Sequence, residues 1–267
     1  MLLSELIEKF ESYWPIAAAD EWDRVGLAVG SPKANVQRVL VSVDLTQRVI
    51  EEATEKNCEL ILTHHPVLLR GVNSLAEDEL KGALIASLIK SGKAVFTAHT
   101  NADVQVDGAS SEMALAFGLS NLRPIVSGVS GFGHGVIGEL AEAMTLAKFA
   151  EKVAESLPAV SRKVAFAGSK GKQISKVAIC SGAGDSFLTQ VLESEADVYV
   201  TSDLRHHVTL DALETPRANG QLALIDVSHW AAESLWVTSA IQRLADIQNL
   251  EAIASEVVTD PWTEEVA

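Results

Sequence analysis

The sequence predicts an α/β protein with mostly parallel or mixed sheets covered by helices. Short β-branched runs alternate with longer amphipathic stretches from residue 38 to the end. Nearly half of the 267 residues are hydrophobic, which is enough to bury the core of one large domain or two modest ones. No internal repeat or low-complexity tract interrupts the alternation. This combination is typical of largely parallel sheets packed between helices.

The predicted strands are short apolar runs bounded by polar or turn-forming residues. In order, they are 38–43, 59–63, 94–98, 176–180, 197–201 and 222–227, with a last strand near 251–258.

The predicted helices carry apolar residues at helical spacing, and several begin with a Thr or Asp that can cap free main-chain amides. Residues 1–14 form the first, because Leu, Ile and Phe alternate there with Glu and Lys. The others are 46–56, 78–90, 108–117, 144–156, 185–193, 204–213 and a long apolar helix at 230–245.

The alternation breaks between residues 119 and 138, where Pro124 and several glycines punctuate the chain. We therefore expect the chain to cross there between two α/β domains. The predicted division is a metal-binding domain of residues 1–125 plus 222–267, and a second α/β domain of residues 126–221.

The charge and the cysteines exclude several classes of protein. The 36 acidic and 21 basic residues leave a net charge of −15, which disfavours nucleic acid and anionic lipid as partners. Cys58 and Cys180 lie far apart in apolar runs and are expected to be small core residues in a reducing compartment. The chain has neither a signal-peptide pattern nor an apolar run long enough to span a bilayer, so we expect a cytoplasmic protein.

Metal-ligating residue types follow three of the predicted strands. His64 and His65 follow the strand at 59–63, His99 and Asp103 follow the strand at 94–98, and His229 follows the strand at 222–227. Because catalytic groups in parallel sheets gather at the carboxyl ends of strands, we expect a site there.

Glu233 lies four residues after His229, so both side chains would project from one face of the last long helix. With His64, His65 and Asp103 they supply three imidazoles and two carboxylates, enough for two divalent ions with positions open to water. Taken singly, each of these residues is also compatible with a hydrogen-bonded structural histidine or a helix cap.

A second polar cluster allows two interpretations. Asp203, His206 and His207 follow the strand at 197–201. Asp203 is expected to cap a helix whose first turn carries both histidines, although all three could line the same cavity as the metal ligands. Trp22 is expected to anchor a loop, with Asp23 and Arg24 paired beside it.

Five short blocks, in this order, resemble the signature blocks of the GTP cyclohydrolase 1 type 2 homologues, also called the NIF-three-like dinuclear-metal hexamer proteins. The blocks are Trp22 to Leu27, Thr63 to Pro66, Ala98 to Asp103, Thr201 to His207, and Asp226 to His229 with Glu233. The resemblance runs from the first helix to Trp262, and the length matches the compact form without an inserted domain. Arg24, Ser202, Ser228 and Trp230 depart from the family pattern, and none of these departures removes a ligand.

The resemblance implies two divalent ions held by His64, His65, Asp103, His229 and Glu233. It also implies two α/β domains and a ring-shaped homohexamer with the metal sites facing an internal cavity. Asp203, His206 and His207 match a motif not usually counted among the ligands, so they are expected to contact ligands rather than metal.

We therefore expect a metal-dependent hydrolase that acts on a nucleotide or a phosphoester-like small molecule, with Glu233 bridging the ions. His99 is the candidate to orient a ligand or move a proton. Zinc, iron and manganese all suit mixed imidazole and carboxylate ligands. The alternative is a non-catalytic, metal-dependent protein that forms a ring for interaction or metal handling.

Overall fold

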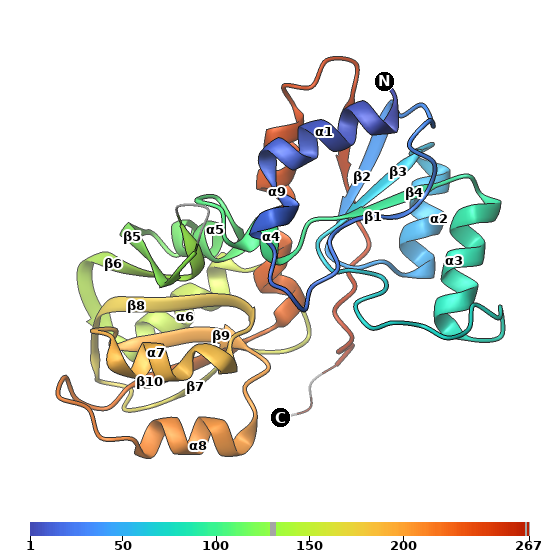
Figure 1. The fold of residues 1–267 in the computed structure, drawn as a ribbon. Coiled ribbons are helices and arrows are strands. Elements are labelled where there is room, and N and C mark those ends of the chain that lie inside the picture. Colours follow the sequence, from blue (N-terminus) through green and yellow to red (C-terminus); the bar gives the residue numbers. More distant parts are fainter. Residues whose placement is uncertain (129–131, 265, 267) are drawn as a thin grey trace. The chain divides into compact units, whose positions relative to one another are not determined.

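A computed structural model describes residues 1–128, 132–264 and 266, and its contacts group into two compact units (Figure 1). The first unit comprises Met1–Ala102 and Val237–Thr259, and the second comprises Asp103–Trp236 and Asp260–Ala267. Each unit contains one mixed sheet covered by helices, which confirms the predicted α/β class.

The sheet of the first unit has five strands in the order β1-β4-β3-β2-β11. Their bounds are β1 Gly26–Val29, β2 Arg38–Ser42, β3 Leu60–Thr63, β4 Ala94–Thr97 and β11 Glu251–Ala254. Neighbouring strands are parallel except β1 and β4, which pair antiparallel. The three central strands β2, β3 and β4 are almost wholly buried and apolar, as parallel strands covered on both faces must be.

The helices of the first unit cover opposite faces of this sheet, as strand alternation requires. They are α1 Leu3–Tyr13, α2 Gln47–Glu55 and α3 Leu80–Lys90, and a short 3₁₀ turn, Ile16–Ala18, follows α1. Val95 packs in one core cluster with residues of α2 and α3. Its neighbour Phe96 points the other way and meets Phe10 of α1, with ring centroids 4.9 Å apart.

The sheet of the second unit has six strands in the order β5-β6-β8-β9-β10-β7. Their bounds are β5 Leu119–Ser127, β6 Gly133–Thr145, β7 Ala165–Ala167, β8 Gln173–Ala183, β9 Val198–Ser202 and β10 Ala223–Val227. Only β8, β9 and β10 run parallel to one another, and the remaining pairs are antiparallel.

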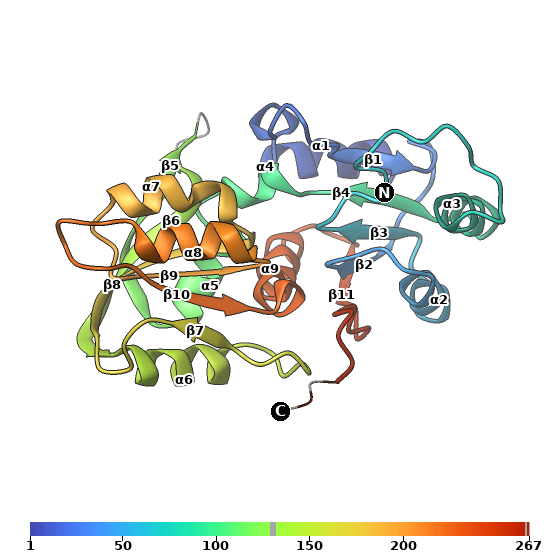
Figure 2. The ribbon, with the colours of Figure 1, turned by 90° about the horizontal axis from the view of Figure 1, so that it is seen from below.

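The helices of the second unit also lie on both faces of their sheet, as Figure 2 shows for α6 on one side and α7 and α8 on the other. The bounds are α5 Ala109–Ala116, α6 Leu146–Ser156, α7 Leu188–Glu193 (after a 3₁₀ turn, Asp185–Phe187) and α8 His206–Glu214. Val200 packs with α5 and α6, whereas Tyr199 packs with α7 and α8. Two further helices, α4 Thr100–Asp103 and α9 His229–Leu244, contain residues of both units.

The prediction that the chain crosses between domains at residues 119–138 is wrong. This stretch contains the paired antiparallel strands β5 and β6 of a single sheet. The glycines serve the hairpin: Gly133 has φ +153°, and a Cβ there would lie 1.9 Å from the carbonyl oxygen of Val126. Gly131, another glycine of the stretch, lies outside the described residues.

The two units also differ in their boundaries from the predicted domains. Residues 103–125 and 222–236, which the sequence assigned to the metal-binding domain, belong by their contacts to the second unit. Two of the changes of unit fall inside α4 and α9, and the third lies between Thr259 and Asp260. A boundary within a helix gives no signal in the composition. Among the described residues, no helix is both long and apolar enough to cross a membrane.

Candidate metal centre

His64 and His65 follow β3 directly, and each has its Nδ1 atom against an oxygen that can only accept. Nδ1 of His64 lies 3.0 Å from the carbonyl oxygen of Ala98. Nδ1 of His65 lies 2.7 Å from Oδ1 of Asp44. In a neutral imidazole each Nδ1 therefore carries the proton and donates it, which leaves Nε2 with the lone pair that a metal requires.

His99 follows β4 and is held in the same way. Its Nδ1 lies 2.9 Å from Oδ1 of Asp23, whose other oxygen accepts the hydroxyl of Thr100 at 2.6 Å and its main-chain amide at 3.1 Å. Burial opposes ionisation of Asp23, but the hydrogen bonds from His99 and Thr100 outweigh it and hold its pKa well below the usual value. Asp23 is therefore a buried, ionised acceptor.

The three imidazoles of the first unit lie together. One ring nitrogen from each of His64, His65 and His99 lies within 4.8 Å of the other two, close enough to hold one metal ion. Their ring centroids are 5.2 to 5.4 Å apart. The sequence placed His99 near the ligands as a proton-moving group, and the structure brings it into the imidazole cluster itself.

In the second unit, His229 and Glu233 form a pair on the first turns of α9. Nε2 of His229 lies 3.0 Å from Oε1 of Glu233, and its Nδ1 lies 2.6 Å from Oδ2 of Asp203. The hydrogen bond from His229 lowers the pKa of Asp203, and burial opposes this only in part. Asp203 has φ +57°, a left-handed conformation, at the turn that follows β9.

Gly182 on β8 provides the space for this pair. A Cβ at Gly182 would lie 2.3 Å from Oε1 of Glu233 and 3.3 Å from Nε2 of His229, and its φ of +76° is a conformation that favours glycine. The main chain of β8 thus approaches both side chains more closely than any other residue would permit.

Asp103, at the end of α4, acts on the same buried thiol as Glu233. Burial raises the pKa of Cys180 to about 12, and the negative charges of Asp103 and Glu233 add to the effect. Cys180 and Cys58 are buried, free cysteines, as expected of core residues.

Asp203 does not cap α8, contrary to the sequence-based expectation. The residue at the cap position is Arg205, which makes no capping side-chain hydrogen bond, and Asp203 instead orients His229. His206 and His207 are exposed on the first turn of α8, with ring centroids 5.1 Å apart. Neither joins a group of side chains able to hold a metal ion among the described residues.

The sequence analysis did not identify the two carboxylates of the first unit, Asp44 and Asp23, as acceptors for histidines. Asp44 follows β2, so the strand-end rule that selected His64 applied to it equally. Asp23 was expected to pair with Arg24, whereas the Arg24 guanidinium donates to the main-chain oxygens of Glu21 and Asp23. Trp22 does not anchor its loop: its side chain is 56% exposed, and its ring meets that of His99 edge-on at 5.9 Å.

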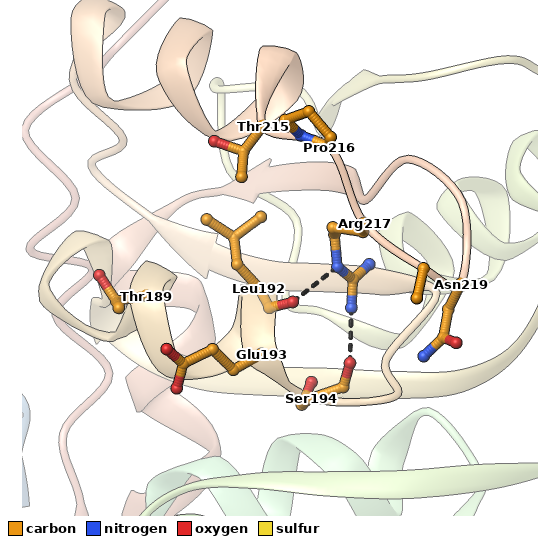
Figure 3. A pocket seen from close by; sticks show the side chains of 9 residues that line it. Thr189, Leu192, Glu193, Ser194, Thr215, Pro216, Arg217 and Asn219 are labelled. Atoms are coloured by element: carbon orange, nitrogen blue, oxygen red, sulfur yellow. Dashed lines mark hydrogen bonds between the residues drawn. The ribbon is translucent and has the colours of Figure 1, made fainter.

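A cavity of about 360 Å³ near α7 lies among residues that include Leu192, Ser194 and Arg217 (Figure 3). The Arg217 guanidinium donates to the carbonyl oxygens of Leu192, Ser194 and Ala196 at 2.7 to 3.0 Å. Because its donors already serve main-chain carbonyls at the end of α7, this arginine stabilises the turn rather than binding an anion.

The whole chain is similar to known proteins. The family model of Duf34/NIF3 (NGG1p interacting factor 3) matches residues 1–261. A Streptomyces coelicolor protein named GTP cyclohydrolase 1 type 2 homolog is 38% identical over 274 aligned residues, covering 99% of this chain and 95% of the relative. A Clostridium perfringens protein of the same name is 30% identical, covering 98% and 99%.

Solved structures share the fold. A Staphylococcus aureus hypothetical protein superimposes with a TM-score of 0.88 at 27% identity, over 99% of both chains. A Bacillus cereus protein related to NIF3 has the same TM-score at 23% identity, over 98% of both chains. These two bacterial proteins therefore share the fold of this chain.

Proposed function

Because the chain belongs to the Duf34/NIF3 family, we propose that it binds two divalent metal ions and acts as a metal-dependent hydrolase. The proposed ligands are His64, His65, Asp103, His229 and Glu233. The substrate class is a nucleotide or a phosphoester-like small molecule. One observation supports the metal centre above all others. In each of four histidines, Nδ1 lies within hydrogen-bond distance of an acceptor oxygen, and the four are His64, His65, His99 and His229.

This arrangement fits metal binding because a ligating histidine almost always donates its other ring N–H to a carboxylate or carbonyl. In the first unit, Ala98, Asp44 and Asp23 accept from His64, His65 and His99 respectively. In the second unit, Asp203 accepts from His229. A carboxylate partner also makes the imidazole more basic, which strengthens its bond to a cation.

The carboxylates complete the donor set. Glu233 is only 4% exposed and lies against the main chain of β8, so it is the best candidate to bridge two ions. Asp103 supplies a second hard oxygen from the end of α4. Imidazole and carboxylate together suit zinc, iron and manganese, and each is a metal to test.

Divalent ions held by these residues would acidify a water molecule and stabilise negative charge that develops on the substrate. The chain itself contributes proton transfer through His99. Asp23 fixes its Nδ1–H, so Nε2 is the nitrogen that accepts or returns a proton.

A purine nucleotide is the first substrate to test. The names of the Streptomyces and Clostridium relatives refer to a GTP cyclohydrolase, and they support this choice. Trp22 supports it independently, because its exposed ring beside His99 offers a face on which a base can stack. The net charge of −15 disfavours nucleic acid as substrate or partner.

The second candidate function is a non-catalytic protein in which the metal ions organise a ring for interaction or metal handling. We propose a toroidal homohexamer for either function, from the resemblance to the family. We also propose a cytoplasmic location, because free, buried cysteines suit a reducing compartment.

The experiment that tests hydrolysis compares the wild type with His99→Gln after loading each with zinc, iron or manganese. Purine nucleotides and phosphomonoesters are offered as substrates, and product is measured by chromatography. Turnover that falls at least tenfold in His99→Gln, with the metal content unchanged, supports the enzyme. Metal-loaded wild type that turns over none of these substrates contradicts the hydrolase and favours the second candidate.

A further inference from the structure

Residues 255–259, which follow β11, form neither helix nor strand, yet they are hydrogen-bonded to the first unit at several points. We call residues 255–259 the C-terminal strap. The amide of Ser255 donates to the carbonyl oxygen of Val41 at 2.8 Å. The hydroxyl of Ser255 and the amide of Glu256 both donate to the carboxylate of Glu52, the latter at 2.8 Å. Glu52 is 7% exposed, so this end of the strap is held by a buried acceptor.

The other end of the strap reaches the candidate metal centre. The hydroxyl of Thr259 donates to Oδ2 of Asp44 at 2.5 Å. Oδ1 of the same carboxylate accepts from Nδ1 of His65 at 2.7 Å. An ionised carboxylate only accepts, so the proton of each of these hydrogen bonds belongs to Thr259 and to His65.

The same arrangement occurs a second time in this unit. Thr100 donates its hydroxyl to Oδ2 of Asp23, and Oδ1 of Asp23 accepts from Nδ1 of His99. Two separate histidines of the imidazole cluster are thus each oriented by an aspartate whose remaining oxygen takes a threonine hydroxyl. Because the same three-residue arrangement occurs twice, we infer that the threonine hydroxyl is a regular part of it, as the aspartate and the histidine are.

Asp23 and Asp44 differ in how much their burial restricts the orientation of the carboxylate. The Asp23 side chain is fully buried, and it also accepts two main-chain amides, from Arg24 and Thr100. The Asp44 side chain is 32% exposed. A carboxylate has a broad preference for rotation about its last bond, and water competes for an exposed one. Because water can reach the Asp44 carboxylate, the hydrogen bond from Thr259 helps to fix its orientation.

We propose that Thr259 is a positioning residue: through Asp44 it holds His65 in the Nδ1–H form, with Nε2 available to a divalent cation. The inference rests on the proposed metal centre and deepens it, because it makes the C-terminal strap part of that centre. The chain separates Thr259 from Asp44 by 215 positions, so the strap links distant parts of the sequence through one carboxylate.

The test uses Thr259→Val, which removes the hydroxyl but keeps the shape, and Thr259→Ser, which restores it. Ser255→Ala is the matched control, because it loosens the strap at Glu52 without touching Asp44. Zinc affinity is measured by competition with a chromophoric chelator. The ¹⁵N spectrum of the histidine rings is recorded on metal-free protein labelled at histidine, with His65 assigned by substitution.

We expect Thr259→Val to raise the Kd for zinc about 3- to 10-fold, less than the roughly 10- to 100-fold typical of partners that contact a ligand directly. In the metal-free spectrum, Thr259→Val should shift His65 from the Nδ1–H form to a mixture of tautomers. Thr259→Ser and Ser255→Ala should resemble the wild type in both measurements.

Two results would overturn the inference. One is wild-type zinc affinity together with an unchanged His65 spectrum in Thr259→Val. The other is an equal loss of affinity in Ser255→Ala, which would assign the effect to anchoring of the strap. Failure of the proposed metal centre is a separate outcome, in which the wild type binds no zinc. In that case the spectrum of the metal-free protein still decides whether Thr259 orients His65.

Discussion

Four acceptor oxygens determine which ring nitrogen carries the proton in the histidines of the candidate centre, which are His64, His65, His99 and His229. Three belong to carboxylates, Asp23, Asp44 and Asp203, and the fourth is the carbonyl oxygen of Ala98. The histidines themselves could be selected from the sequence, because they follow strands. Their partners could not all be found, since Asp23 and His99 are 76 positions apart and no local pattern connects them.

At the residue scale, Gly182→Ala should disturb the pair formed by His229 and Glu233 in the second unit. The added Cβ would meet Oε1 of Glu233 at 2.3 Å, and alanine at φ +76° is strained, so we expect a loss of about 1 to 3 kcal/mol in unfolding free energy. Metal affinity should fall as well, because Glu233 must move. Urea unfolding and metal titration measure the two effects.

Gly171→Ala is the control for this change, because a Cβ at Gly171 meets nothing within 4 Å. Equal stability and equal metal affinity of the two variants would show that the close approach at Gly182 is not required.

Also at the residue scale, Trp22→Ala tests the substrate class. If a purine base stacks on the exposed indole, the substitution should cost about 1 to 3 kcal/mol of nucleotide binding, on the order of a 5- to 150-fold weaker Kd. Calorimetry with a non-hydrolysed guanine nucleotide and metal-loaded protein provides the measurement. Metal content should not change.

Trp262→Ala is the control for Trp22→Ala, because Trp262 is a tryptophan of similar exposure, 59% against 56%. It should bind the nucleotide like the wild type. If Trp22→Ala retains full affinity, the base does not stack on Trp22.

At the scale of elements, the parallel strands explain why part of the site was predictable. β2, β3 and β4 are buried apolar runs with clear ends, and the polar residues after those ends are Asp44, His64 and His99. The short antiparallel strands β1 and β7 were missed, because four and three residues carry too little periodicity. The glycine-rich hairpin was misjudged, because turn glycines and linker glycines look alike in sequence.

The contact between the C-terminal strap and α2 predicts a pH dependence of stability. Burial raises the pKa of Glu52, but the hydrogen bonds from the Glu256 amide, Lys56 and Ser255 lower it by more. The pKa of Glu52 is therefore below its usual value. A depressed pKa means that this stabilisation is present above the unfolded pKa, about 4.3 for a glutamate. It is lost as the pH falls through the folded value.

We therefore expect Glu52→Gln to cost about 1 to 3 kcal/mol at pH 7 and progressively less as the pH falls below about 4.5. Urea unfolding of both proteins between pH 7 and pH 3 measures the difference. Glu51→Gln, an exposed neighbour on α2, serves as the control and should differ little from the wild type at any pH. A Glu52→Gln deficit that grows on acidification would reverse the sign and refute the account.

At the scale of the whole molecule, the proposed ligands are spread over the sequence, from His64 to Glu233. The family model covers residues 1–261, so the match includes every one of these positions. Ligand types at strand ends could be recognised without a structure. The boundaries of the units could not, because two of them fall within the helices α4 and α9.

The metal content per chain measures directly whether this protein binds two divalent ions. It is measured by atomic spectroscopy on protein reconstituted with zinc or manganese and freed of excess ion, for the wild type, His64→Ala, Glu233→Gln and the exposed control His206→Ala. We predict about two ions per chain in the wild type and in His206→Ala, and fewer in the other two, with unchanged circular dichroism. A wild type that retains no metal, or variants at His64 and Glu233 that retain both ions, would contradict the account.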